Sequence, residues 1–500
     1  MSPRQHPLLE MKTKNPWHRP LIICVAIVFA VAVIGMVTTG VIQNRHIRQK
    51  YKYGIVLDAG SSHTSVYVYQ WPAEKENNTG MVQQTHVCNV KGKGISSYAG
   101  SPDAAGSALG ECMEEARSKV PTERQKETPV YLGATAGMRL LRMENQSASD
   151  QVLASVENFL KVTPLSYQGA CIITGQEEGA YGWITVNYLG DNFRKAQRTM
   201  GALDLGGAST QITFVSGVEA QSPQDFIHFR LYGNEYHVYT HSFLCYGKDQ
   251  ALRLALSHRL RALPETTNST LLDHCFHTGY RKQKDLSDVY DSPCVSKQGT
   301  PTGTFIHQGA GNWSLCHQHV QGLFNFSQCA KRSCSFNGVF QPPLQGTFGA
   351  FSAFFFVMNF LNLTSGSLDD AKQRLTSYCS TPWEKIQKDH PKVKEKYLSE
   401  YCFSGTYILT LLEDGYNFTS DTWKEIKFIK KIGDSDAGWT LGYMLNMTNM
   451  IPAEAPDRPP LPHSGYVAVM VLLALLLPGL LFLGYRLFRR SGSASRKQIV

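Results

Sequence analysis

The chain has 500 residues, of which 42% are hydrophobic, and a formal net charge of +9. The positive charge is concentrated at residues 1–20, 43–52 and 486–500, and the rest of the chain is slightly acidic. This distribution argues against a nucleic-acid-binding protein, which would carry a basic patch on its folded domain. The length predicts two lobes rather than a single core.

The first predicted element is an uncharged apolar segment at residues 21–42. Its length is about the 20 residues that a helix needs to cross a bilayer, and it is too long for the apolar region of a cleaved signal peptide. Basic residues flank it on both sides, so these charges leave its orientation open. We expect a transmembrane helix here.

Two segments further along follow the same plan. Strands predicted at 53–58 and 64–70 enclose one Gly/Ser/Thr turn, and a run that begins at 201 and ends in Asp204 is joined by a similar turn to a β-branched run at 212–215. Each first run ends in an aspartate, which is typical of a hairpin with a tight turn. Small residues let the turn backbone approach an anion, and successive N–H groups form an anion-binding nest. The aspartates would repel phosphate alone, so we expect a bridging divalent cation and a duplicated domain that closes on a polyphosphate.

Strands and helices alternate around these hairpins, which indicates α/β layering. We predict helices at 104–119 and 149–161, strands at 129–135 and 170–174, and a glycine-bounded turn at 175–179 that carries Glu177 and Glu178. Residues 245–345 are rich in cysteine and glycine and are expected to be loop-heavy, and helices are predicted at 349–362, 368–379 and 382–413.

Several common site signatures do not occur in the sequence. There is no Gly-x-x-x-x-Gly-Lys-Ser/Thr motif, which disfavours a P-loop nucleotidase. Neither Cys-x-x-Cys nor His-Glu-x-x-His occurs, which disfavours a zinc site. If the protein handles phosphate, the paired aspartate turns must do so.

The C-terminal part contains a second membrane signal. Residues 452–462 contain five prolines and are expected to form a stiff stalk. An uncharged apolar segment follows at 465–485, and the tail at 486–500 has five basic residues and no acidic ones, which predicts a cytoplasmic tail. The chain should therefore span the membrane twice.

Glycosylation sequons and cysteines indicate the compartment of the domain between the spans. All eight Asn-x-Ser/Thr sequons lie there, which predicts a lumenal or extracellular domain and two cytoplasmic tails. They are Asn77, Asn145, Asn268, Asn312, Asn325, Asn362, Asn417 and Asn446. Eleven of the twelve cysteines lie outside the first span, and in an oxidising compartment they permit five disulfides with one cysteine left over. The sequence alone does not pair them.

Five segments in this order resemble the five apyrase motifs. They are DAGSSHTS at 58–65, GATAGMR at 133–139, GQEEGAYGW at 175–183, DLGGASTQ at 204–211 and DAGWTLGY at 436–443. The chain resembles the cell-surface ecto-nucleoside triphosphate diphosphohydrolases, or ecto-apyrases, over nearly its whole length. Segments 239–247 and 394–402 look most like the vascular type-one branch of that family.

This resemblance implies an α/β fold of two actin/sugar-kinase-like, that is ribonuclease H-like, lobes with a central nucleotide cleft, flanked by two transmembrane helices. The implied divisions are a cytoplasmic tail at 1–20, a span at 21–42, lobe I at 43–174 completed by 430–464, lobe II at 175–429, a span at 465–485 and a cytoplasmic tail at 486–500. The implied disulfides are Cys88–Cys112, Cys245–Cys294, Cys275–Cys316, Cys329–Cys334 and Cys379–Cys402, with Cys171 left over. The segment 189–200 looks shorter than the aromatic-rich, membrane-facing loop that the family usually has.

The resemblance also suggests catalytic roles. Glu178 matches the family's catalytic base, with Ser209 and Gln211 positioning the attacking water, and Glu177 is expected to be structural. Taken alone, the pentapeptide 175–179 is more simply interpreted as a pair of solvated carboxylates on a loop. Together with the other four motifs, it favours a catalytic carboxylate in a cleft. Asp58 and Asp204 are expected to hold Ca²⁺ or Mg²⁺ mostly through water, because the ligands are all oxygen.

The remaining site residues are also implied by the family pattern. Thr135, Glu178 and Trp439 would lie near the metal. The phosphate donors would be Ser61, Ser62, His63, Thr64, Thr135, Ala136, Gly137, Gly206, Gly207 and Ala208. His63 could instead be a loop histidine that caps backbone groups. Stacking between Phe356 and Tyr397, with Lys248 nearby, would hold the nucleobase, although most aromatics around Phe356 are expected to be core.

We therefore expect a multi-pass plasma-membrane enzyme with an extracellular catalytic domain. It would cleave extracellular ATP, ADP and other nucleoside tri- and diphosphates to the monophosphate, using Ca²⁺ or Mg²⁺, and so regulate purinergic signalling. Homo-oligomers could form through the transmembrane helices, and no nucleic acid is involved. The alternatives are a non-catalytic nucleotide-binding receptor or adhesion protein, and an intracellular actin-like or sugar-kinase-like ATPase, which the sequons, cysteines and spans oppose.

Overall fold

A computed structural model describes residues 18–44, 51–72, 82–193, 198–217, 223–231, 233–262, 269–295, 302–331, 333–447 and 463–495. The chain separates into two compact units. One contains the two terminal helices, and the other comprises residues 51–72 and 78–456. The sequons at Asn77 and Asn268 and the proline-rich segment 452–462 lie outside the described residues.

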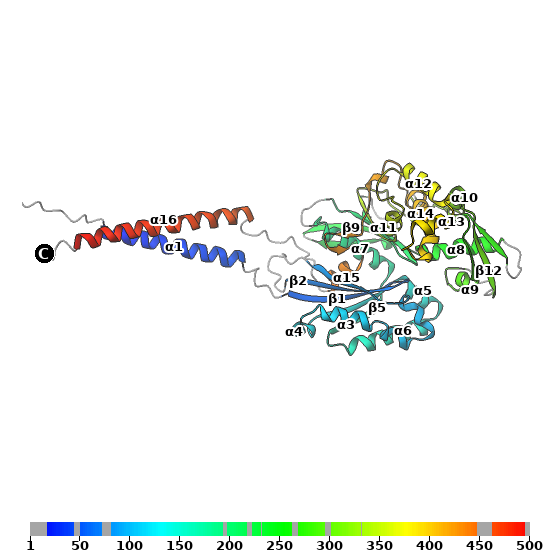
Figure 1. Ribbon diagram of the computed structural model, residues 1–500, viewed down its shortest axis with the longest axis horizontal. Helices are drawn as coiled ribbons and strands as arrows, with labels where there is room; N and C mark the ends of the chain where they lie inside the picture. Colours follow the sequence, from blue (N-terminus) through cyan, green and yellow to red (C-terminus); the bar gives the residue numbers. More distant parts are fainter. Residues whose placement is uncertain are drawn as a thin grey trace, which may run out of the picture. The chain divides into compact units, whose positions relative to one another are not determined.

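The terminal helices have the length and composition of membrane spans. Helix α1 (His18–Asn44) contains a candidate span at Arg19–Gly40 with a mean hydropathy of 3.0, and α16 (His463–Ser495) contains one at Ser464–Arg489 with a mean hydropathy of 2.7. The helices lie side by side (Figure 1). A Cβ at Gly484 near the end of α16 would lie 3.6 Å from Val25 near the start of α1, so the two helices run antiparallel.

The first large sheet has five strands in the order β3-β2-β1-β4-β5. The strands β1 (Tyr51–Ala59), β2 (Thr64–Pro72) and β3 (Gln83–Asn89) are antiparallel neighbours. On the other side of β1, the strands β4 (Pro129–Ala134) and β5 (Ser166–Ile172) run parallel. The first predicted hairpin is therefore confirmed as β1–β2 and lies at the centre of the sheet.

The second large sheet repeats this arrangement in the order β14-β13-β6-β7-β9-β8. The second predicted hairpin is β6 (Gly201–Leu205) and β7 (Ser209–Val215), and it continues antiparallel into β9 (Asn234–Leu244) and β8 (Phe226–Leu231). The strands β13 (Phe348–Ser352) and β14 (Ile426–Phe428) are parallel on the other side of β6. The expected fold class, two ribonuclease H-like sheets of the same topology, is confirmed.

Helices cover the outer faces of both sheets (Figure 1). The first sheet packs against α2 (Asp103–Ser107), α3 (Gly110–Ser118), α5 (Ala136–Glu144) and α6 (Gln146–Lys161), and the one-turn helix α4 (Thr122–Gln125) follows α3 in the chain. The second lies in a core with α8 (Lys248–Leu260), α9 (Ser287–Tyr290), α10 (Trp313–Gln321), α11 (Ala353–Phe360), α12 (Leu368–Ser380), α13 (Trp383–Asp389) and α14 (Glu395–Thr410), which ends in a π-helical turn, Leu411–Gly415.

The structure refines one sequence expectation for this region and corrects another. The described part of residues 245–345 is rich in loops, as expected, but it also contains α8, α9, α10 and a three-stranded sheet of β10 (Thr270–Asp273), β12 (Thr304–Gly309) and β11 (Arg281–Asp285). The predicted helix at 349–362 is divided between β13 and α11. A short apolar run fits a buried strand as well as a buried helix, so its periodicity could not separate the two.

Two helices lie between the sheets: α7 (Gly175–Leu189) and α15 (Thr440–Met447), which follows the small hairpin β15 (Lys431–Ile432) and β16 (Ser435–Asp436). Their side chains form a buried cluster with Val56 of β1 and Ala202 of β6. A Cβ at Gly442 in α15 would lie 2.1 Å from the Tyr181 carbonyl oxygen in α7, so glycine is required for this close crossing.

Strand periodicity points both motif aspartates toward this central layer. In β1, Ile55, Leu57 and Ala59 face the outer helices, whereas Val56 faces α7 and α15. Side chains alternate between the faces of a strand, so Asp58 lies on the same face as Val56. In β6 the same alternation places Asp204 on the face of Ala202, opposite Leu203 and Leu205.

The cysteines pair as the family resemblance implies. The five disulfides are Cys88–Cys112, Cys245–Cys294, Cys275–Cys316, Cys329–Cys334 and Cys379–Cys402. Cys24 and Cys171 remain free. Cys171 lies on the edge strand β5, and its Sγ is 3.7 Å from the Tyr443 hydroxyl.

The short segment 189–200 is closed by one buried side chain. The Asn187 amide accepts from Met200 N at 2.7 Å and donates to Met200 O at 2.8 Å, so it joins the end of α7 to the residue before β6. Its oxygen also accepts from Asn192 Nδ2 at 2.9 Å. Residues 194–197 of this segment lie outside the described part.

Candidate active site

The segments expected to bind phosphate converge on Ser61 in the β1–β2 turn. A Cβ at Gly207 in the β6–β7 turn would lie 2.7 Å from Ser61 Oγ, and one at Gly137 in α5 would lie 2.7 Å from Ser61 Cα. Glycine is therefore required at 137, where the close atom belongs to the backbone, whereas at 207 a side chain would displace the Ser61 hydroxyl. Ala136 and Ala208 are buried in one small cluster, so turns from both sheets and the start of α5 meet at one place.

The other expected phosphate residues lie beside this meeting point. Thr135 is the N-cap residue of α5, a helix terminus at which free N–H groups favour an anion. The Gly206 carbonyl accepts from Lys248 N at 2.9 Å, and the Gly207 carbonyl accepts from Asp249 N at 2.9 Å, which fixes the second turn against α8. In the first turn, Ser62 Oγ and His63 Nδ1 are exposed and hydrogen-bonded at 2.9 Å, and Thr64 is buried at the start of β2.

Three acidic side chains share the buried space between the sheets. Asp58 comes from β1, Asp204 from β6 and Glu178 from the first turn of α7. Burial, then the charges of Glu178 and Asp204, raise the pKa of Asp58 well above its usual value, against a hydrogen bond from Trp439. Burial and the Glu178 charge raise the pKa of Asp204 to about 7. Three carboxyl groups in electrostatic contact need a compensating positive charge to ionise together.

This arrangement fits a divalent cation that is held largely through water. Asp58 Oδ1 is buried and has no hydrogen-bond partner among the described residues, and oxygen ligands suit Ca²⁺ and Mg²⁺. Within the described ranges, no three His, Cys, Asp or Glu side chains could ligate one ion directly. The Trp439 indole is a hydrogen-bond donor only, so its direct role is to orient Asp58.

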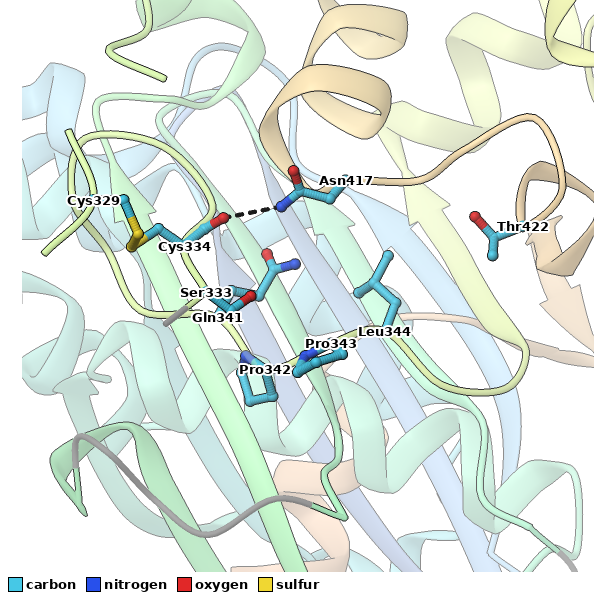
Figure 2. A pocket seen from close by; sticks show the side chains of 9 residues that line it. All are labelled: Cys329, Ser333, Cys334, Gln341, Pro342, Pro343, Leu344, Asn417 and Thr422. Carbon is cyan, nitrogen blue, oxygen red and sulfur yellow. Dashed lines mark hydrogen bonds between the residues drawn. A yellow bond between two sulfur atoms is a disulfide. The ribbon is translucent and has the colours of Figure 1, made fainter. Parts of the chain in front are cut away.

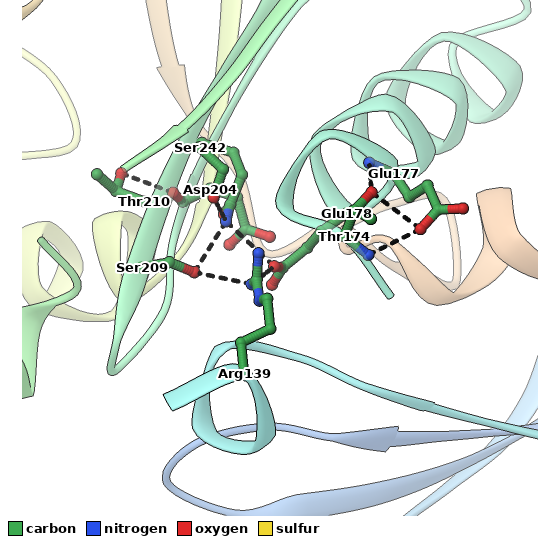
Figure 3. Close-up of polar contacts among 9 residues, drawn as sticks. Arg139, Thr174, Glu177, Glu178, Asp204, Ser209, Thr210 and Ser242 are labelled. Atoms are coloured by element: carbon green, nitrogen blue, oxygen red, sulfur yellow. Dashed lines mark hydrogen bonds and ion pairs between the residues drawn. The ribbon is translucent and has the colours of Figure 1, made fainter. Parts of the chain in front are cut away.

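Glu178 lies at the centre of a polar network that links both lobes (Figure 3). Its Oε2 accepts from the Arg139 guanidinium and, at 3.1 Å, from Gln211 Nε2. The same two residues donate to Ser209 Oγ, Arg139 at 3.3 Å and Gln211 at 2.9 Å. The expected catalytic residues Glu178, Ser209 and Gln211 are thus brought together.

The electrostatics of Glu178 suit a base. Burial raises its pKa, and the Arg139 charge and hydrogen bond oppose that rise. The hydrogen bonds from Arg139 and Gln211 both reach Oε2, and no described residue hydrogen-bonds Oε1. One carboxylate oxygen is therefore fixed, and the other is available to a water molecule.

Glu177 has a different role from its neighbour. The motif forms the first turn of α7 rather than the expected glycine-bounded turn, because Thr174 and Glu177 form a capping box. Glu177 Oε2 accepts from Thr174 N at 2.7 Å and from Thr174 Oγ1 at 2.9 Å, and its side chain lies apart from that of Glu178 (Figure 3). The structural role expected for Glu177 is therefore confirmed.

The residues expected at the nucleobase lie on the second lobe. Phe356 of α11 and Tyr397 of α14 are 55% and 46% exposed, which is unusual among the mostly buried aromatics around them. The described part contains no ring contact between them. Lys248 Nζ pairs with Asp249 at 2.5 Å and Glu400 at 3.1 Å. Burial lowers the pKa of Lys248, but these two carboxylates outweigh burial and raise it above its ordinary value.

Sequence reasoning missed two members of the network. Arg139 ends the second motif, and its charge next to a glycine-rich segment was the available signal. Ser242 on β9 accepts from Gln211 Nε2 at 2.8 Å, because Gln211 and Ser242 are opposite each other in the β7–β9 register. No local pattern marks Ser242, because the pairing depends on the strand order.

Comparisons with known proteins agree with this geometry. Residues 44–460 match the profile of the GDA1/CD39 (nucleoside phosphatase) family. The chain is 50% identical over 500 residues to ectonucleoside triphosphate diphosphohydrolase 1 of Rattus norvegicus, covering 96% of this chain and 97% of that protein. It is 43% identical over 507 residues to ectonucleoside triphosphate diphosphohydrolase 3 of Homo sapiens, covering 96% and 95%.

A solved structure shares the fold. The nucleoside triphosphate hydrolases from Neospora caninum superpose with a TM-score of 0.56 at 14% identity, covering 87% of this chain and all of that chain. At this identity the likeness concerns the fold alone.

Proposed function

The chain belongs to the GDA1/CD39 (nucleoside phosphatase) family, and on that premise we propose that it hydrolyses extracellular ATP, ADP and other nucleoside tri- and diphosphates to the monophosphate. Family membership makes it an enzyme that hydrolyses nucleoside phosphates. The observation that carries this proposal is the Glu178 network beside Asp58 and Asp204, where the β1–β2 turn, the β6–β7 turn and the start of α5 converge.

In this mechanism Glu178 is the general base. Arg139 and Gln211 hold Oε2, so Oε1 accepts a proton from the attacking water. Ser209 and Gln211 position that water in line with the terminal phosphorus. Ser61, Gly137 and Gly207 bring turn backbone and the start of α5 to the phosphate oxygens.

Asp58 and Asp204 would hold Ca²⁺ or Mg²⁺, which when bound neutralises negative charge on the phosphate oxygens. Trp439 keeps Asp58 oriented through its hydrogen bond. Thr135 and Glu178 complete the surroundings of the ion through water. Phe356, Tyr397 and Lys248 form the base subsite, where stacking tolerates different nucleobases.

The membrane arrangement is part of the proposal. Both tails face the cytoplasm and the catalytic domain faces outside, where hydrolysis of ATP and ADP would regulate purinergic signalling. The six sequon asparagines within the described residues are all exposed, which supports a glycosylated surface. The two terminal helices also offer a route to homo-oligomers.

The lobe division at 174/175, with 430–464 completing lobe I, is likewise a proposal. It is supported by the strands, since the first sheet uses residues 51–172 and the second uses 201–428. The return of α15 to pack beside Val56 of β1 supports the assignment of the C-terminal segment.

The direct test is phosphate release by intact cells that express the full chain. ATP, ADP, other nucleotides and AMP are supplied outside, with and without EDTA, and cells expressing Glu178→Gln are the matched control. We expect phosphate from tri- and diphosphates only, loss of release with EDTA, and recovery with excess Ca²⁺ or Mg²⁺. Nucleotide binding without phosphate release above the control would instead favour the non-catalytic receptor.

A further inference from the structure

A pocket of about 440 Å³ opens on lobe II away from the catalytic network. Figure 2 shows its walls: Cys334 and Ser333 on one side, Asn417 and Thr422 along the rim, and residues 342–344 opposite Asn417. None of its lining residues belongs to the Glu178 network or to the phosphate turns. The pocket therefore requires a separate explanation.

Asn417 is a glycosylation sequon held rigidly on this rim. Its neighbours Tyr416 and Phe418 are 0% and 1% exposed, so the backbone is anchored on both sides, while Asn417 itself is exposed. Its Nδ2 donates to the Cys334 carbonyl at 3.0 Å. An asparagine amide has two N–H hydrogens, and a glycan replaces one of them, so the bond to Cys334 can persist in the modified residue. A glycan on Asn417 thus begins at the pocket mouth.

The pocket has the chemistry of a sugar-binding surface. Pro342, Pro343 and Leu344 supply apolar atoms that suit the C–H face of a sugar ring. Ser333 adds a hydroxyl group to the wall. Gln341 is only 1% exposed, and its Nε2 donates to Tyr416 O at 2.8 Å, but its Oε1 has no partner among the described residues. Gln341 thus adds a buried amide to the lining of the pocket.

We propose that the first N-acetylglucosamine of the glycan on Asn417 lies in this pocket, over residues 342–344. Its acetamide and hydroxyl groups supply polar partners to the wall, and its ring covers the apolar floor. The Cys334 carbonyl belongs to the small loop closed by Cys329–Cys334. The sugar therefore braces that loop against the segment that follows α14.

The chain offers a matched control in Asn362. Both asparagines are exposed and have left-handed backbones, with φ of 58° at Asn362 and 66° at Asn417, but Asn362 does not line this pocket. The full chain is made in cells that attach only oligomannose glycans and is digested natively with peptide-N-glycosidase. Glycopeptide mass spectrometry follows release at each site.

We expect the Asn417 glycan to be released about tenfold more slowly than the Asn362 glycan, since cleavage requires local opening. Leu344→Ala, which removes part of the floor, and Ser333→Phe, which fills the pocket, should bring the two rates together while ATP hydrolysis is unchanged. An unmodified Asn417, equal release rates in the parent chain, or slow release that both variants leave unaltered would overturn the proposal.

A second measurement separates the first sugar from the rest of the glycan. Parent chain trimmed by an endoglycosidase, which leaves the first N-acetylglucosamine attached, is compared with untrimmed parent chain and with Asn417→Gln, which keeps a side-chain amide but carries no glycan; peptide-N-glycosidase is not used here because it converts Asn417 to aspartate. Amide hydrogen exchange at residues 333–341 should be unchanged by trimming and several-fold faster in Asn417→Gln. Faster exchange after trimming would show that outer sugars make the contact, and no change in Asn417→Gln would show that no sugar occupies the pocket.

Discussion

Asp273 at the end of β10, Asp204 and the half-buried Asp58 are all acids largely withdrawn from solvent, but their surroundings are opposite. Asp273 is 3% exposed, pairs with Arg259 at 2.6 Å and His307 at 2.8 Å, and accepts from Cys275 N at 2.9 Å. Burial alone would raise the pKa of Asp273, but the His307 and Arg259 contacts hold it well below its usual range.

Asp58 and Asp204 lie beside another carboxylate instead of a cation, and their pKa values are raised. The comparison separates two uses of a buried charge. At Asp273 the chain supplies cationic and N–H partners, so the acid is part of the fold. At Asp58, where Oδ1 has no partner among the described residues, and at Asp204, which lies beside a carboxylate, we expect a cation from outside the chain. Four experiments can break or sharpen this distinction.

The largest effect is expected from Glu178→Gln. The amide preserves shape but cannot take a proton from water, and general-base catalysis contributes about 10²–10⁴-fold. Turnover of both ATP and ADP should fall by that factor, measured as phosphate release by purified protein, while nucleotide binding persists. Glu177→Gln is the matched control and should have a mild effect, because Glu177 only caps α7. Loss of turnover in Glu177→Gln together with normal turnover in Glu178→Gln would show that Glu177, not Glu178, is the base.

The second experiment compares Asp273→Asn with Asp204→Asn without divalent cation. Asp273→Asn removes the carboxylate from the buried His307 and the half-buried Arg259 and should cost about 3–5 kcal/mol in the free energy of unfolding. In the parent chain, the lowered pKa of Asp273 contributes stability above the pKa that this group has in the unfolded chain, and this contribution is lost as the pH falls further. The stability of the variant should therefore depend less on pH in the acid range. Urea unfolding at several pH values measures both effects.

Asp204→Asn should leave metal-free stability unchanged or slightly higher. The raised pKa means that the folded state binds the proton more tightly than the unfolded state, so stability falls as the pH rises toward 7. The amide removes that cost. Activity should follow the reverse order, with Asp204→Asn losing cation-dependent hydrolysis and folded Asp273→Asn keeping it. Equal losses of stability in Asp273→Asn and Asp204→Asn would show that both acids contribute to the fold in the same way.

A buried base extends the comparison to pH. His277 is 0% exposed and bonds Thr381 O at 2.8 Å, and burial lowers its pKa to about 4. As the pH is lowered from about 6.5 to 4, the histidine binds a proton in the unfolded chain but not in the folded chain. The free energy of unfolding therefore decreases by about 3 kcal/mol over this range. His277→Gln should flatten the curve over this range in urea unfolding. Parallel curves for the two proteins would show that His277 does not contribute.

Cation removal should have the smallest effect on stability. An ion that binds only the folded state adds about 2 kcal/mol when present at roughly 30 times its dissociation constant. EDTA should therefore lower the unfolding midpoint of the parent chain and leave that of Asp204→Asn unaltered. A shift of the same size in both proteins would place the stabilising ion elsewhere.

The sequence predicted what depends on local chemistry. The aspartate turns identified β1–β2 and β6–β7, and the five motifs brought Glu178, Ser209 and Gln211 into one site by family resemblance. It did not predict the Arg139–Glu178 pair, whose members come from α5 and α7, or the cross-strand pair Gln211–Ser242, because neither has a local pattern. The roles assigned to the phosphate, metal and nucleobase residues stay predictions.

The disulfides divide the covalent chain in a way that the lobes alone do not indicate. Cys88–Cys112 ends before the other four begin at Cys245, and no disulfide among the described cysteines crosses that interval. One cut between residues 112 and 245 would therefore leave two separate polypeptides, each with one membrane helix and its own complete set of cystines. Packing around α7 and α15, the α1–α16 pair, and contacts such as Tyr69–Thr440 at 2.7 Å and Gln84–Asp436 at 2.7 Å would hold them together without a covalent link. The protein thus consists of two halves with separate sets of disulfides, and the backbone between residues 112 and 245 is their only covalent link.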